Sequence, residues 1–369
     1  MKIAFLDLGG WEYTVDTPLT QPMGGTESAL CYLAMELAAF DNEVTIYNGT
    51  KTAMEAIAGL PLHYRPATDL STLNSHDVVI VKASPVGREL RGIGVKVPMY
   101  LWLQHDVDQP AVKPLLGRKE VDAWTGIVFV SEWQRNRYVE FYRIPVERTL
   151  VMRNAVSPAF LTPHNPPSPW TGFGAPVLWY ASTPYRGLNV LLDAWPKIRE
   201  ATGASLRVYS SMSVYRADPA ADAAQFGQLY DGARTMQGVT YCGSMGQSDL
   251  VHDLATYNLA GLAYPSTFPE TSCIAALEAQ ALGAEVMSTN LGALPETTGS
   301  DSLLPFTPDL PKLVEAYAAY AIARIEWGAN NPEEATTAFD ARRQRILDAY
   351  TWPIRALDWT YMLKVNAAR

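Results

Sequence analysis

LAGLAYPSTFPETSCIAALEAQALGAEVMS, residues 259–288, contains two short apolar runs separated by a loop and a helix-forming segment. The runs LAGLAY and EVMS have the length and composition of buried strands, and we expect the helix between them to begin near Thr271. A strand, a helix and a second strand in this order form a parallel βαβ unit, because parallel strands need a crossover connection. The stretch therefore predicts an α/β fold.

The same alternation extends in both directions along the chain. The strands are continuous apolar runs, as expected in a parallel sheet that is covered on both faces. The last third of the chain reads as helical. Expected strands lie at residues 2–8, 43–47, 77–82, 97–103 and 126–130, and again at 177–181, 205–210, 239–242, 259–264 and 285–288.

The length of the chain and one proline-rich segment predict the domain boundaries. A chain of 369 residues is too long for one ordinary core, so two domains are expected. The segment VSPAFLTPHNPPSPWTGFGAP interrupts the alternation with six prolines. We therefore expect a first domain at 1–155, a linker at 156–176, a second domain at 177–349 and a terminal helix at 350–369. Ligands of such sheets bind at the carboxyl ends of the strands, in a cleft.

The charge and the cysteines disfavour several classes of protein. The formal net charge of −9 disfavours binding to a nucleic acid polymer. Cys31, Cys242 and Cys273 form no CxxC pair, which is typical of a protein of the reducing cytoplasm. Asp7 interrupts the N-terminal apolar run, so that run does not resemble a signal peptide. Since no run of 18 apolar residues exists, we expect at most peripheral membrane contact.

Two glutamates, Glu270 and Glu278, are the most informative polar residues of the opening stretch. If both were helical, they would lie about 12 Å apart along the axis and be rotated by roughly 80°. This separation exceeds the range of about 5 to 9.5 Å used by carboxylate pairs in glycoside hydrolysis, which disfavours a general acid and base on this element. Two interpretations stay open: Glu270 caps the helix and Glu278 is solvated, or both contact one long ligand.

The backbone between the two glutamates predicts a phosphate site. The first amides of a helix have no intrahelical partner and present a positive dipole. With a helix that begins near Thr271, these amides belong to Thr271, Ser272, Cys273 and Ile274. A ligand that contains a sugar, a diphosphate and a ribose in this order would place the sugar at Glu270, the diphosphate at the amides and the ribose at Glu278. Carboxylates suit the two outer positions, because they accept hydrogen bonds from vicinal hydroxyls.

Residues 265–296 resemble the donor-binding segment of glycosyltransferase family 4, a group of retaining enzymes with the GT-B fold. The shared positions are Pro265, Ser266, Glu270, Glu278, Ala279, Ala281, Gly283, Gly292, Pro295 and Glu296. The resemblance implies that Glu278 holds the ribose of a nucleoside diphosphate sugar and that Glu270 contacts its sugar. The family's G-F-G is Thr271-Ser272-Cys273 here, which places side chains beside the phosphate loop.

Other segments resemble the family in the same order along the chain. PMGGTESALCYLAMELA resembles its N-terminal glycine loop, which implies that Gly24 and Gly25 let the backbone approach the donor. LWLQHDVDQ places His105 after a strand, where the family often has a histidine near the donor sugar. ASTPYRGLNVLLDAW implies that Arg186 binds the diphosphate. A second basic residue that many members carry upstream is absent from residues 179–182.

The resemblance implies an enzyme that moves a sugar from a nucleoside diphosphate sugar to a hydroxyl group, with retention of the anomeric configuration. The catalytic residues that it implies are His105, Arg186 and Glu270. The fold that it implies has two Rossmann-like domains facing a cleft, with the terminal helix packed on the first domain. The acceptor can be a glycan, a glycolipid or a small molecule, and polysaccharide biosynthesis is an expected role.

We expect no metal and no other cofactor. The five histidines form no HxxxH or HxH pair, and no CxxC exists. Asp106 and Asp108 form a D-x-D, the metal motif of the other large glycosyltransferase fold, but they lack its usual setting. The sequence also contains no P-loop and no good G-x-G-x-x-G.

Two other functions stay open. A nucleotide-sugar epimerase has the same double fold, although its site needs several acids and histidines around the sugar, and only His105 and Glu270 are candidates. A non-catalytic sugar-nucleotide binding protein would make the donor contacts without turnover. The sequence leaves open the base, the sugar, the acceptor, the linkage and the oligomeric state.

Overall fold

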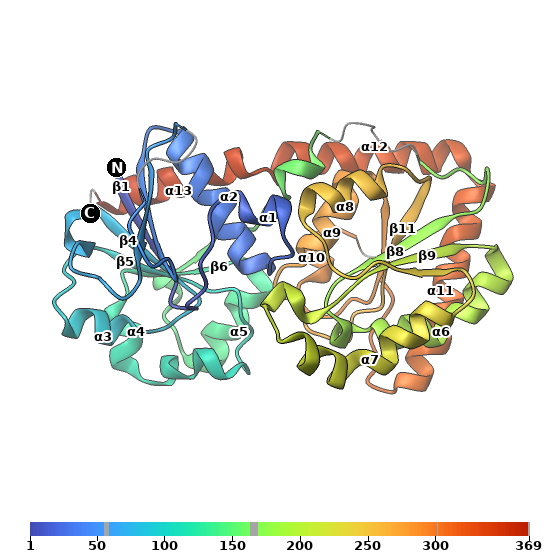
Figure 1. Ribbon diagram of the computed structural model, residues 1–369, viewed down its shortest axis with the longest axis horizontal. Coiled ribbons are helices and arrows are strands. Elements are labelled where there is room, and N and C mark those ends of the chain that lie inside the picture. Colours follow the sequence, from blue (N-terminus) through green and yellow to red (C-terminus); the bar gives the residue numbers. More distant parts are fainter. Residues whose placement is uncertain (55–58, 163–168, 301, 368–369) are drawn as a thin grey trace. The chain divides into compact units, whose positions relative to one another are not determined.

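The computed structural model describes residues 1–54, 59–162, 169–300 and 302–367 and divides the chain into two compact units. The first unit comprises Met1–Asp16, Thr26–Ala155 and Trp352–Arg369, and the second comprises Thr17–Gly25 and Val156–Thr351 (Figure 1). Each unit is built on its own sheet. The predicted α/β class is confirmed, because every strand pairing within the two sheets is parallel.

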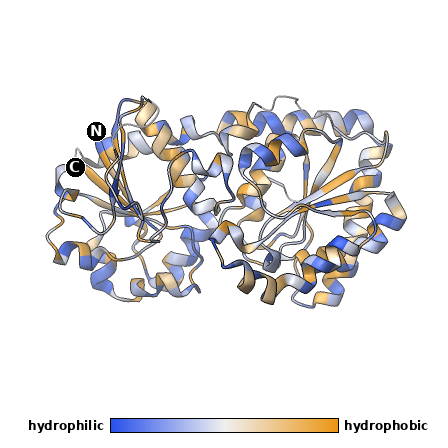
Figure 2. Cartoon of the chain, viewed as in Figure 1, coloured by the Kyte–Doolittle hydropathy of each residue, from blue (hydrophilic) through white to orange (hydrophobic). Residues whose placement is uncertain are grey.

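The sheet of the first unit has the strand order β3-β2-β1-β4-β5-β6-β7. Its strands are β1 (Lys2–Leu6), β2 (Glu43–Asn48), β3 (Leu62–Pro66), β4 (Val78–Lys82), β5 (Met99–Trp102), β6 (Gly126–Phe129) and β7 (Thr149–Val151). The helices of this unit are α2 (Gly25–Ala39), α3 (Gly87–Gly92), α4 (Arg118–Ala123), α5 (Glu132–Tyr142) and α13 (Trp352–Ala367). The central strands are buried on both faces, and Figure 2 shows them as predominantly hydrophobic.

Helix α13 packs on the first unit through one apolar stripe. Trp352, Ala356, Trp359 and Leu363 recur at helical spacing and are buried. The ring of Trp359 meets the ring of Trp102 edge-on, with 5.4 Å between the centroids. The C-terminal residues therefore lie with the first unit, although residues 156–351 before them lie with the second.

The sheet of the second unit has the strand order β10-β9-β8-β11-β12. Its strands are β8 (Val177–Ala181), β9 (Ser205–Tyr209), β10 (Val239–Tyr241), β11 (Leu259–Tyr264) and β12 (Glu285–Ser288). Its helices are α1 (Thr17–Thr20), α6 (Leu188–Thr202), α7 (Pro219–Thr235), α8 (Gln247–Leu254), α9 (Ile274–Ala281), α10 (Leu294–Thr298), α11 (Leu310–Asn330) and α12 (Pro332–Ala349).

One segment lies with a different unit from the one expected. Residues 17–25 fall inside the expected first domain, 1–155, but the structure groups Thr17–Gly25 with the second unit. The reason is that α1 packs on α8: a Cβ added to Gly246, at the start of α8, would lie 2.6 Å from the carbonyl carbon of Thr20. Residues 163–168 of the expected linker lie outside the described residues.

In both sheets the strand order reverses beside the first strand of the unit. The reversal falls between β1 and β4 in the first sheet and between β8 and β11 in the second. The crossovers leave these neighbouring strands in opposite directions, and in open α/β sheets ligands bind at the carboxyl ends of such strands. The residues after β8 and β11 therefore define the first place to look for a site.

Candidate functional site

The loops that follow β8 and β11 touch each other at the switch point of the second sheet. Gly187 ends the loop after β8 with a φ of 110°, and an added Cβ would lie 2.1 Å from the carbonyl oxygen of Pro265. Only a glycine fits this conformation and this close approach. The contact brings Arg186, which precedes Gly187, toward Glu270, which follows β11.

Arg186 and Glu270 form a partly buried ion pair. Nη1 of Arg186 donates to both carboxylate oxygens of Glu270, at 2.8 and 3.1 Å. The hydroxyl of Tyr264 donates to the same carboxylate. Glu270 is only 4% exposed, so its charge depends on these partners for stabilisation.

The rest of the Arg186 guanidinium is surrounded by aromatic side chains. Nη2 donates to the hydroxyl of Tyr215 at 3.2 Å, and the guanidinium carbon lies 4.6 Å from the ring centroid of Phe268. Nε is buried and has no partner among the described residues. Burial lowers the pKa of Arg186, but the Glu270 carboxylate and the neighbouring tyrosines together raise it by more, so the pKa lies well above its ordinary value. Arg186 thus stays charged.

The backbone of Glu270 is fixed by Gly292. Gly292 has a φ of 69°, and an added Cβ would lie 2.5 Å from the carbonyl oxygen of Glu270. The next amide, that of Ala293, donates to this oxygen at 2.7 Å. The glycine of the sequence motif therefore serves to hold Glu270 in place.

Helix α9 begins at Ile274, so the expected start near Thr271 was wrong by three residues. Cys273 is the N-cap residue and makes no side-chain cap, so Glu270 does not cap the helix. The backbone bends at Thr271 and Ser272, and Cys273 is extended. The amides of Ser272, Cys273 and Ile274 have no hydrogen-bond partner among the described residues. These amides still form a helix N-terminus that suits an anion.

Gly25 lies beside this helix N-terminus. A Cβ added to Gly25 would lie 3.1 Å from Cδ1 of Ile274, the first residue of α9. Gly24, the residue before it, is buried and belongs to the same unit. The structure therefore places the glycine loop of residues 24–25 next to the free amides.

Glu278 is buried inside α9 and is not a solvated surface charge. It is 6% exposed, and its Oε1 has no hydrogen-bond partner among the described residues. Burial raises the pKa of Glu278 to about 8, although a hydrogen bond with the side chain of Gln247 opposes this shift. The protein therefore holds a protonated, incompletely paired carboxyl group at neutral pH, which a ligand with hydroxyl groups can satisfy.

His105 belongs to the first unit and follows β5. The side chain of Gln134 donates to the carbonyl oxygen of His105 at 2.7 Å, which fixes its backbone. Burial lowers the pKa of His105, and the charge of Lys82 lowers it further. Lys82 in turn forms ion pairs with Asp7 at 2.9 Å and Glu27 at 2.5 Å. His105 thus belongs to the first unit, whereas Arg186, Glu270 and Glu278 belong to the second, in which Arg186 and Glu270 are in direct contact.

The carboxylate of Asp106 in the D-x-D motif is already paired with an arginine side chain. Asp106 is fully buried, and the guanidinium of Arg137 donates to its two oxygens at 2.8 and 3.0 Å. Asp108 is exposed. Within the part of the chain that the structure describes, no three His, Cys, Asp or Glu side chains lie together as a metal site would need.

The sequence alone did not single out Tyr215 and Gln247. Tyr215 lies in the loop after β9, and Gln247 begins α8. The available signal was topological: in a parallel sheet the loops after neighbouring strands meet at one edge, so a polar or aromatic residue after β9 is a candidate partner for residues after β8. That signal requires the strand order, which the sequence does not give.

One family model matches most of the second unit. Residues 175–321 match the family described as glycosyl transferases, group 1. The matched segment contains Arg186, Gln247, Glu270 and Glu278. A comparison of the sequence with curated proteins found no match.

Solved structures show that the complete chain has the GT-B fold. It is similar to sucrose-phosphate synthase from Thermosynechococcus elongatus, with a TM-score of 0.74, 15% identity and 100% of both chains covered. It is similar to Anabaena HepE in complex with UDP-glucose, with a TM-score of 0.71, 15% identity, and 99% of this chain and 100% of that chain covered. It is also similar to WaaG, a glycosyltransferase involved in lipopolysaccharide biosynthesis, with a TM-score of 0.63, 13% identity, and 96% and 98% covered. The predicted fold and family resemblance are confirmed.

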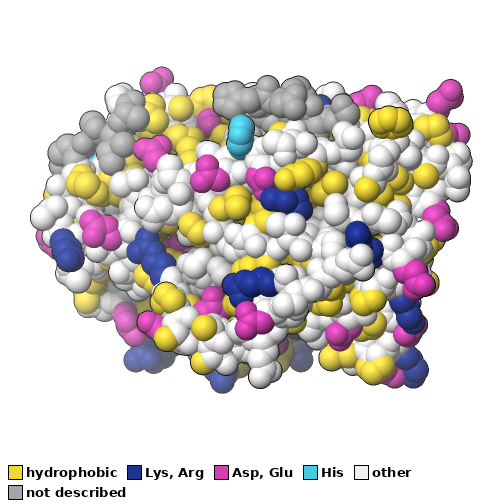
Figure 3. Space-filling view, turned by 45° about the vertical axis from the view of Figure 1, so that its right-hand side comes forward, with side chains coloured by type: hydrophobic (Ala, Val, Ile, Leu, Met, Phe, Trp, Pro, Cys, Tyr) yellow, Lys and Arg dark blue, Asp and Glu magenta, His cyan; other side chains and the backbone are white. Residues whose placement is uncertain are grey.

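The surface offers two further observations. On the face shown in Figure 3, basic side chains are dispersed among acidic and apolar ones. Among the described helices, none combines the length and the apolar character that crossing a membrane requires.

Proposed function

We propose that the chain transfers a sugar from a nucleoside diphosphate sugar to a hydroxyl group of a glycan, a glycolipid or a small molecule, with retention of the anomeric configuration. The observation that carries this proposal is the ion pair of Arg186 and Glu270 at the switch point, beside amides that have no partner among the described residues, within the segment that matches group 1 glycosyl transferases. The three separate cysteines fit a reducing compartment, so we place the reaction in the cytoplasm.

The three parts of the donor correspond to three parts of the site. Glu278 would accept hydrogen bonds from the ribose, because it is buried and no described residue pairs with its Oε1. The amides of Ser272, Cys273 and Ile274 would bind the diphosphate together with Arg186. Glu270 would then face the sugar. The similarity in fold to HepE, which was solved with UDP-glucose, supports this type of donor without naming the base or the sugar.

Arg186 would stabilise the charge that develops on the departing diphosphate. In the ligand-free protein the guanidinium is shared with Glu270 and Tyr215. A bound diphosphate must compete with these two side chains for the guanidinium, and the diphosphate competes better as negative charge accumulates on it in the transition state. Interactions that strengthen in this way accelerate the reaction, whereas equal binding of substrate and transition state does not.

Retention would follow from a substitution on one face of the sugar. Glu270 is a poor candidate for a covalent nucleophile, because Nη1 of Arg186 and the Tyr264 hydroxyl already engage its carboxylate. In the proposed step the bond between the anomeric carbon and the phosphate oxygen breaks, the acceptor oxygen bonds to the same face, and its proton passes to the departing phosphate. His105, whose lowered pKa keeps it neutral near pH 7, would contact the sugar.

A donor panel tests this function. The protein is heated with each of a set of UDP, GDP, ADP and dTDP sugars, and the one that raises the melting temperature is incubated with candidate acceptors. We expect release of the nucleoside diphosphate and a glycoside whose anomeric configuration, read by NMR, equals that of the donor. An isomerised nucleotide sugar identifies an epimerase. Stabilisation without any turnover identifies a binding protein.

Turnover is expected to be independent of divalent metals. Arg186 and the helix amides supply the positive charge that a metal would otherwise supply to the diphosphate. Activity measured in excess EDTA should equal activity in the untreated enzyme. Loss of turnover on chelation, restored by Mn²⁺ or Mg²⁺, contradicts the proposal and would make Asp106 and Asp108 the first residues to test.

Glu270→Gln is expected to slow transfer while tightening the binding of the free nucleoside diphosphate. The variant removes the carboxylate that faces positive charge at the anomeric carbon, so kcat should fall about 10- to 100-fold. It also releases Arg186 from its ion pair, so calorimetric titration with the diphosphate alone should give a Kd several-fold lower than in the wild type. The exposed Glu326→Gln on α11 is the matched control. Weaker diphosphate binding in Glu270→Gln argues against the competition described above.

A further inference from the structure

The Arg186 guanidinium has two kinds of partner. Glu270 accepts from Nη1 at 2.8 and 3.1 Å, and this is the interaction for which a diphosphate would compete. Phe268 and Tyr215 contact the rest of the group: the guanidinium carbon lies 4.6 Å from the ring centroid of Phe268, and Nη2 donates to the Tyr215 hydroxyl at 3.2 Å. Neither contact involves the Glu270 carboxylate, so both can persist after a ligand has displaced it.

The contact with Phe268 has the geometry of a cation–π interaction. A guanidinium within about 6 Å of an aromatic ring centroid is attracted by the ring, and more strongly where water is excluded. The Arg186 side chain is 21% exposed, so most of it is shielded from water. Tyr185 adds a second ring at 5.6 Å, which meets the Phe268 ring edge-on. Since Phe268 makes the shorter contact, we expect it to hold the guanidinium more firmly.

The backbone of Phe268 is fixed before any ligand binds. The hydroxyl of Ser266 donates to the carbonyl oxygen of Phe268 at 2.9 Å and accepts from its amide at 3.3 Å. Ser266 is fully buried, and the hydroxyl of Thr289 donates to its carbonyl oxygen at 2.7 Å. Pro269 follows Phe268 and restricts the backbone of both residues. The loop before Glu270 therefore presents the Phe268 ring in a defined place.

Tyr215 is placed by the short 3-10 helix Met212–Tyr215, which follows β9. The amide of Met212 donates to the carboxylate of Asp222 on α7 at 3.0 Å, which anchors the start of this helix. Burial raises the pKa of Tyr215 above its ordinary value. Its hydroxyl is therefore neutral, and it can accept the hydrogen bond from Nη2 of Arg186 over the whole physiological pH range.

We propose that Phe268 and Tyr215 are positioning residues, which hold the Arg186 guanidinium in place while its anionic partner changes from Glu270 to the diphosphate of the donor. This inference rests on the function proposed above. A cation that is already oriented stabilises developing charge without a cost of reorganisation at the moment of reaction. The two aromatic residues thus act on kcat through Arg186 and do not contact the reacting atoms themselves.

Phe268→Leu tests the ring, because leucine keeps an apolar side chain but has no aromatic face. We expect kcat to fall about tenfold, the loss that corresponds to one desolvated cation–π contact. The donor KM should change by less than about threefold, because the contacts of the ribose and of the helix amides remain. Phe268→Tyr keeps the ring and should restore kcat. A tyrosine variant as slow as the leucine variant overturns the proposal.

Tyr215→Phe tests the hydroxyl, because phenylalanine keeps the ring and removes the acceptor of the Nη2 hydrogen bond. We expect a smaller fall in kcat, by about threefold, again with little change in the donor KM. An unchanged kcat removes Tyr215 from the proposal.

A double-mutant cycle tests whether Phe268 acts through Arg186. In the Arg186→Ala background the guanidinium is missing, so adding Phe268→Leu should change kcat by less than about twofold. Residues that act independently give effects that multiply in rate. A further tenfold loss in the double variant would therefore show that Phe268 has a role of its own, and the positioning role would be wrong.

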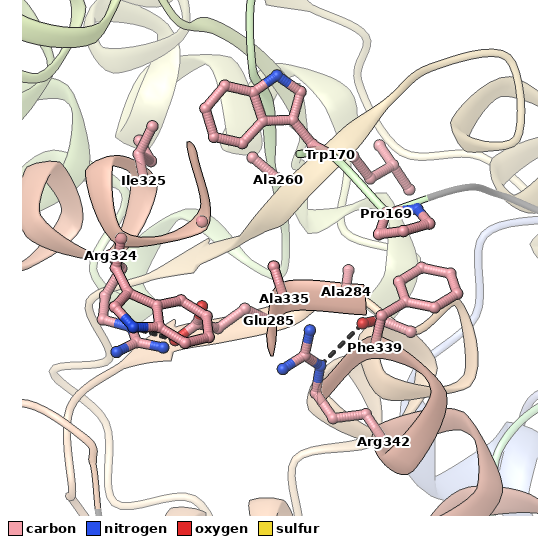
Figure 4. Close-up of a pocket in the computed structure, with 14 residues that line it drawn as sticks. Pro169, Trp170, Ala260, Ala284, Glu285, Arg324, Ile325, Ala335, Phe339 and Arg342 are labelled. Carbon is pink, nitrogen blue, oxygen red and sulfur yellow. Dashed lines mark hydrogen bonds and ion pairs between the residues drawn. The ribbon is translucent and has the colours of Figure 1, made fainter. Parts of the chain in front are cut away.

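Arg324, Glu285 and Trp327 supply a matched control at the other end of the same sheet. Arg324 donates to Glu285, and its guanidinium carbon lies 4.8 Å from the ring centroid of Trp327. Figure 4 shows Arg324 beside Glu285, the first residue of β12, whereas the switch point lies at the carboxyl ends of the strands. Trp327→Leu thus removes a ring from an arginine–glutamate pair outside the site. Its kcat and donor KM should equal those of the wild type, and an equal loss in both leucine variants contradicts the proposal.

An NMR measurement on the ligand-free protein separates this inference from the proposed function. The Nε–H resonance of Arg186 is identified by its loss in Arg186→Lys. Phe268→Leu should shift this resonance and speed its exchange with water, whereas Trp327→Leu should leave it unchanged. If the wild type transfers no sugar, the proposed function fails, and this resonance alone decides whether Phe268 holds the guanidinium. An unchanged Nε–H resonance in Phe268→Leu overturns the inference even if the wild type is an active transferase.

Discussion

Glu278→Gln is expected to stabilise the protein by about 3 to 5 kcal/mol at pH 8 and by only about 1 kcal/mol at pH 5. The reason is the cost of burying a carboxyl group whose Oε1 has no partner among the described residues. Burial raises the pKa of Glu278 from an ordinary value of 4.5 to about 8. Each unit of this shift corresponds to about 1.4 kcal/mol of free energy.

The sign follows from the protons bound in the two states. Between pH 4.5 and about 8 the folded state keeps a proton on Glu278 that the unfolded state releases. The unfolded state therefore binds fewer protons, and the free energy of unfolding falls as the pH rises through this window. Glutamine does not titrate, so the free energy of unfolding of the variant does not fall in this way as the pH rises. At pH 8 the difference corresponds to an increase of about 10 °C in melting temperature for a unit of this size.

Thermal unfolding of the wild type and of Glu278→Gln at pH 5, 6.5 and 8 measures this effect. The exposed Glu326→Gln, in the same unit, should match the wild type at every pH. Calorimetry should also show that Glu278→Gln weakens the binding of the nucleoside diphosphate and raises the donor KM with little change in kcat, because the ribose does not change charge during transfer. Equal pH dependence in wild type and variant contradicts the burial argument.

Arg186→Ala is expected to lower kcat about 10²- to 10³-fold, the usual effect of removing a group that stabilises developing negative charge. The affinity for the nucleoside diphosphate should fall less than kcat does, because the amides of Ser272, Cys273 and Ile274 remain. The substitution also leaves the buried Glu270 carboxylate without its cation, which typically destabilises a protein by about 3 kcal/mol.

A double variant separates the effect on folding from the effect on catalysis. Arg186→Ala combined with Glu270→Gln removes the unpaired charge, so its melting temperature should return toward that of the wild type. Its kcat should stay low, because the stabilising cation is still missing. Arg186→Lys keeps the charge without the planar arrangement of donors, so its kcat should lie between those of the wild type and Arg186→Ala. Recovery of kcat in the double variant would falsify the assigned role of Arg186.

Apolar patterning was enough to predict the fold, except where an element has little apolar character. The ten expected strands are all present, but β3 (Leu62–Pro66) and β7 (Thr149–Val151) were not expected. Both lie at the edges of the first sheet, where one side of the strand has no neighbour and a continuous apolar run is not required. The position of residues 17–25 was also missed, because packing of α1 on α8 joins segments more than 200 residues apart in the chain.

The candidate site was predicted residue by residue but not as a set of contacts. The motif identified Arg186, Glu270 and Glu278, and the structure shows the first two joined over 84 residues of sequence. No spacing rule gives that pair, since it depends on the close approach of Gly187 to Pro265. The burial of Glu278 could not be read from the sequence either, because a glutamate on a short helix is exposed in most proteins.

The grouping of Thr17–Gly25 with the second unit has a consequence for how the gene can be divided. The chain passes from one unit to the other four times, at residues 16/17, 25/26, 155/156 and 351/352, so neither unit is one continuous segment. A fragment covering residues 156–351 would lack α1 and leave the α8 surface around Gly246 uncovered. Truncation or recombination at residues 155/156 and 351/352 therefore does not yield an intact second unit, because the nine residues Thr17–Gly25 would have to be added separately.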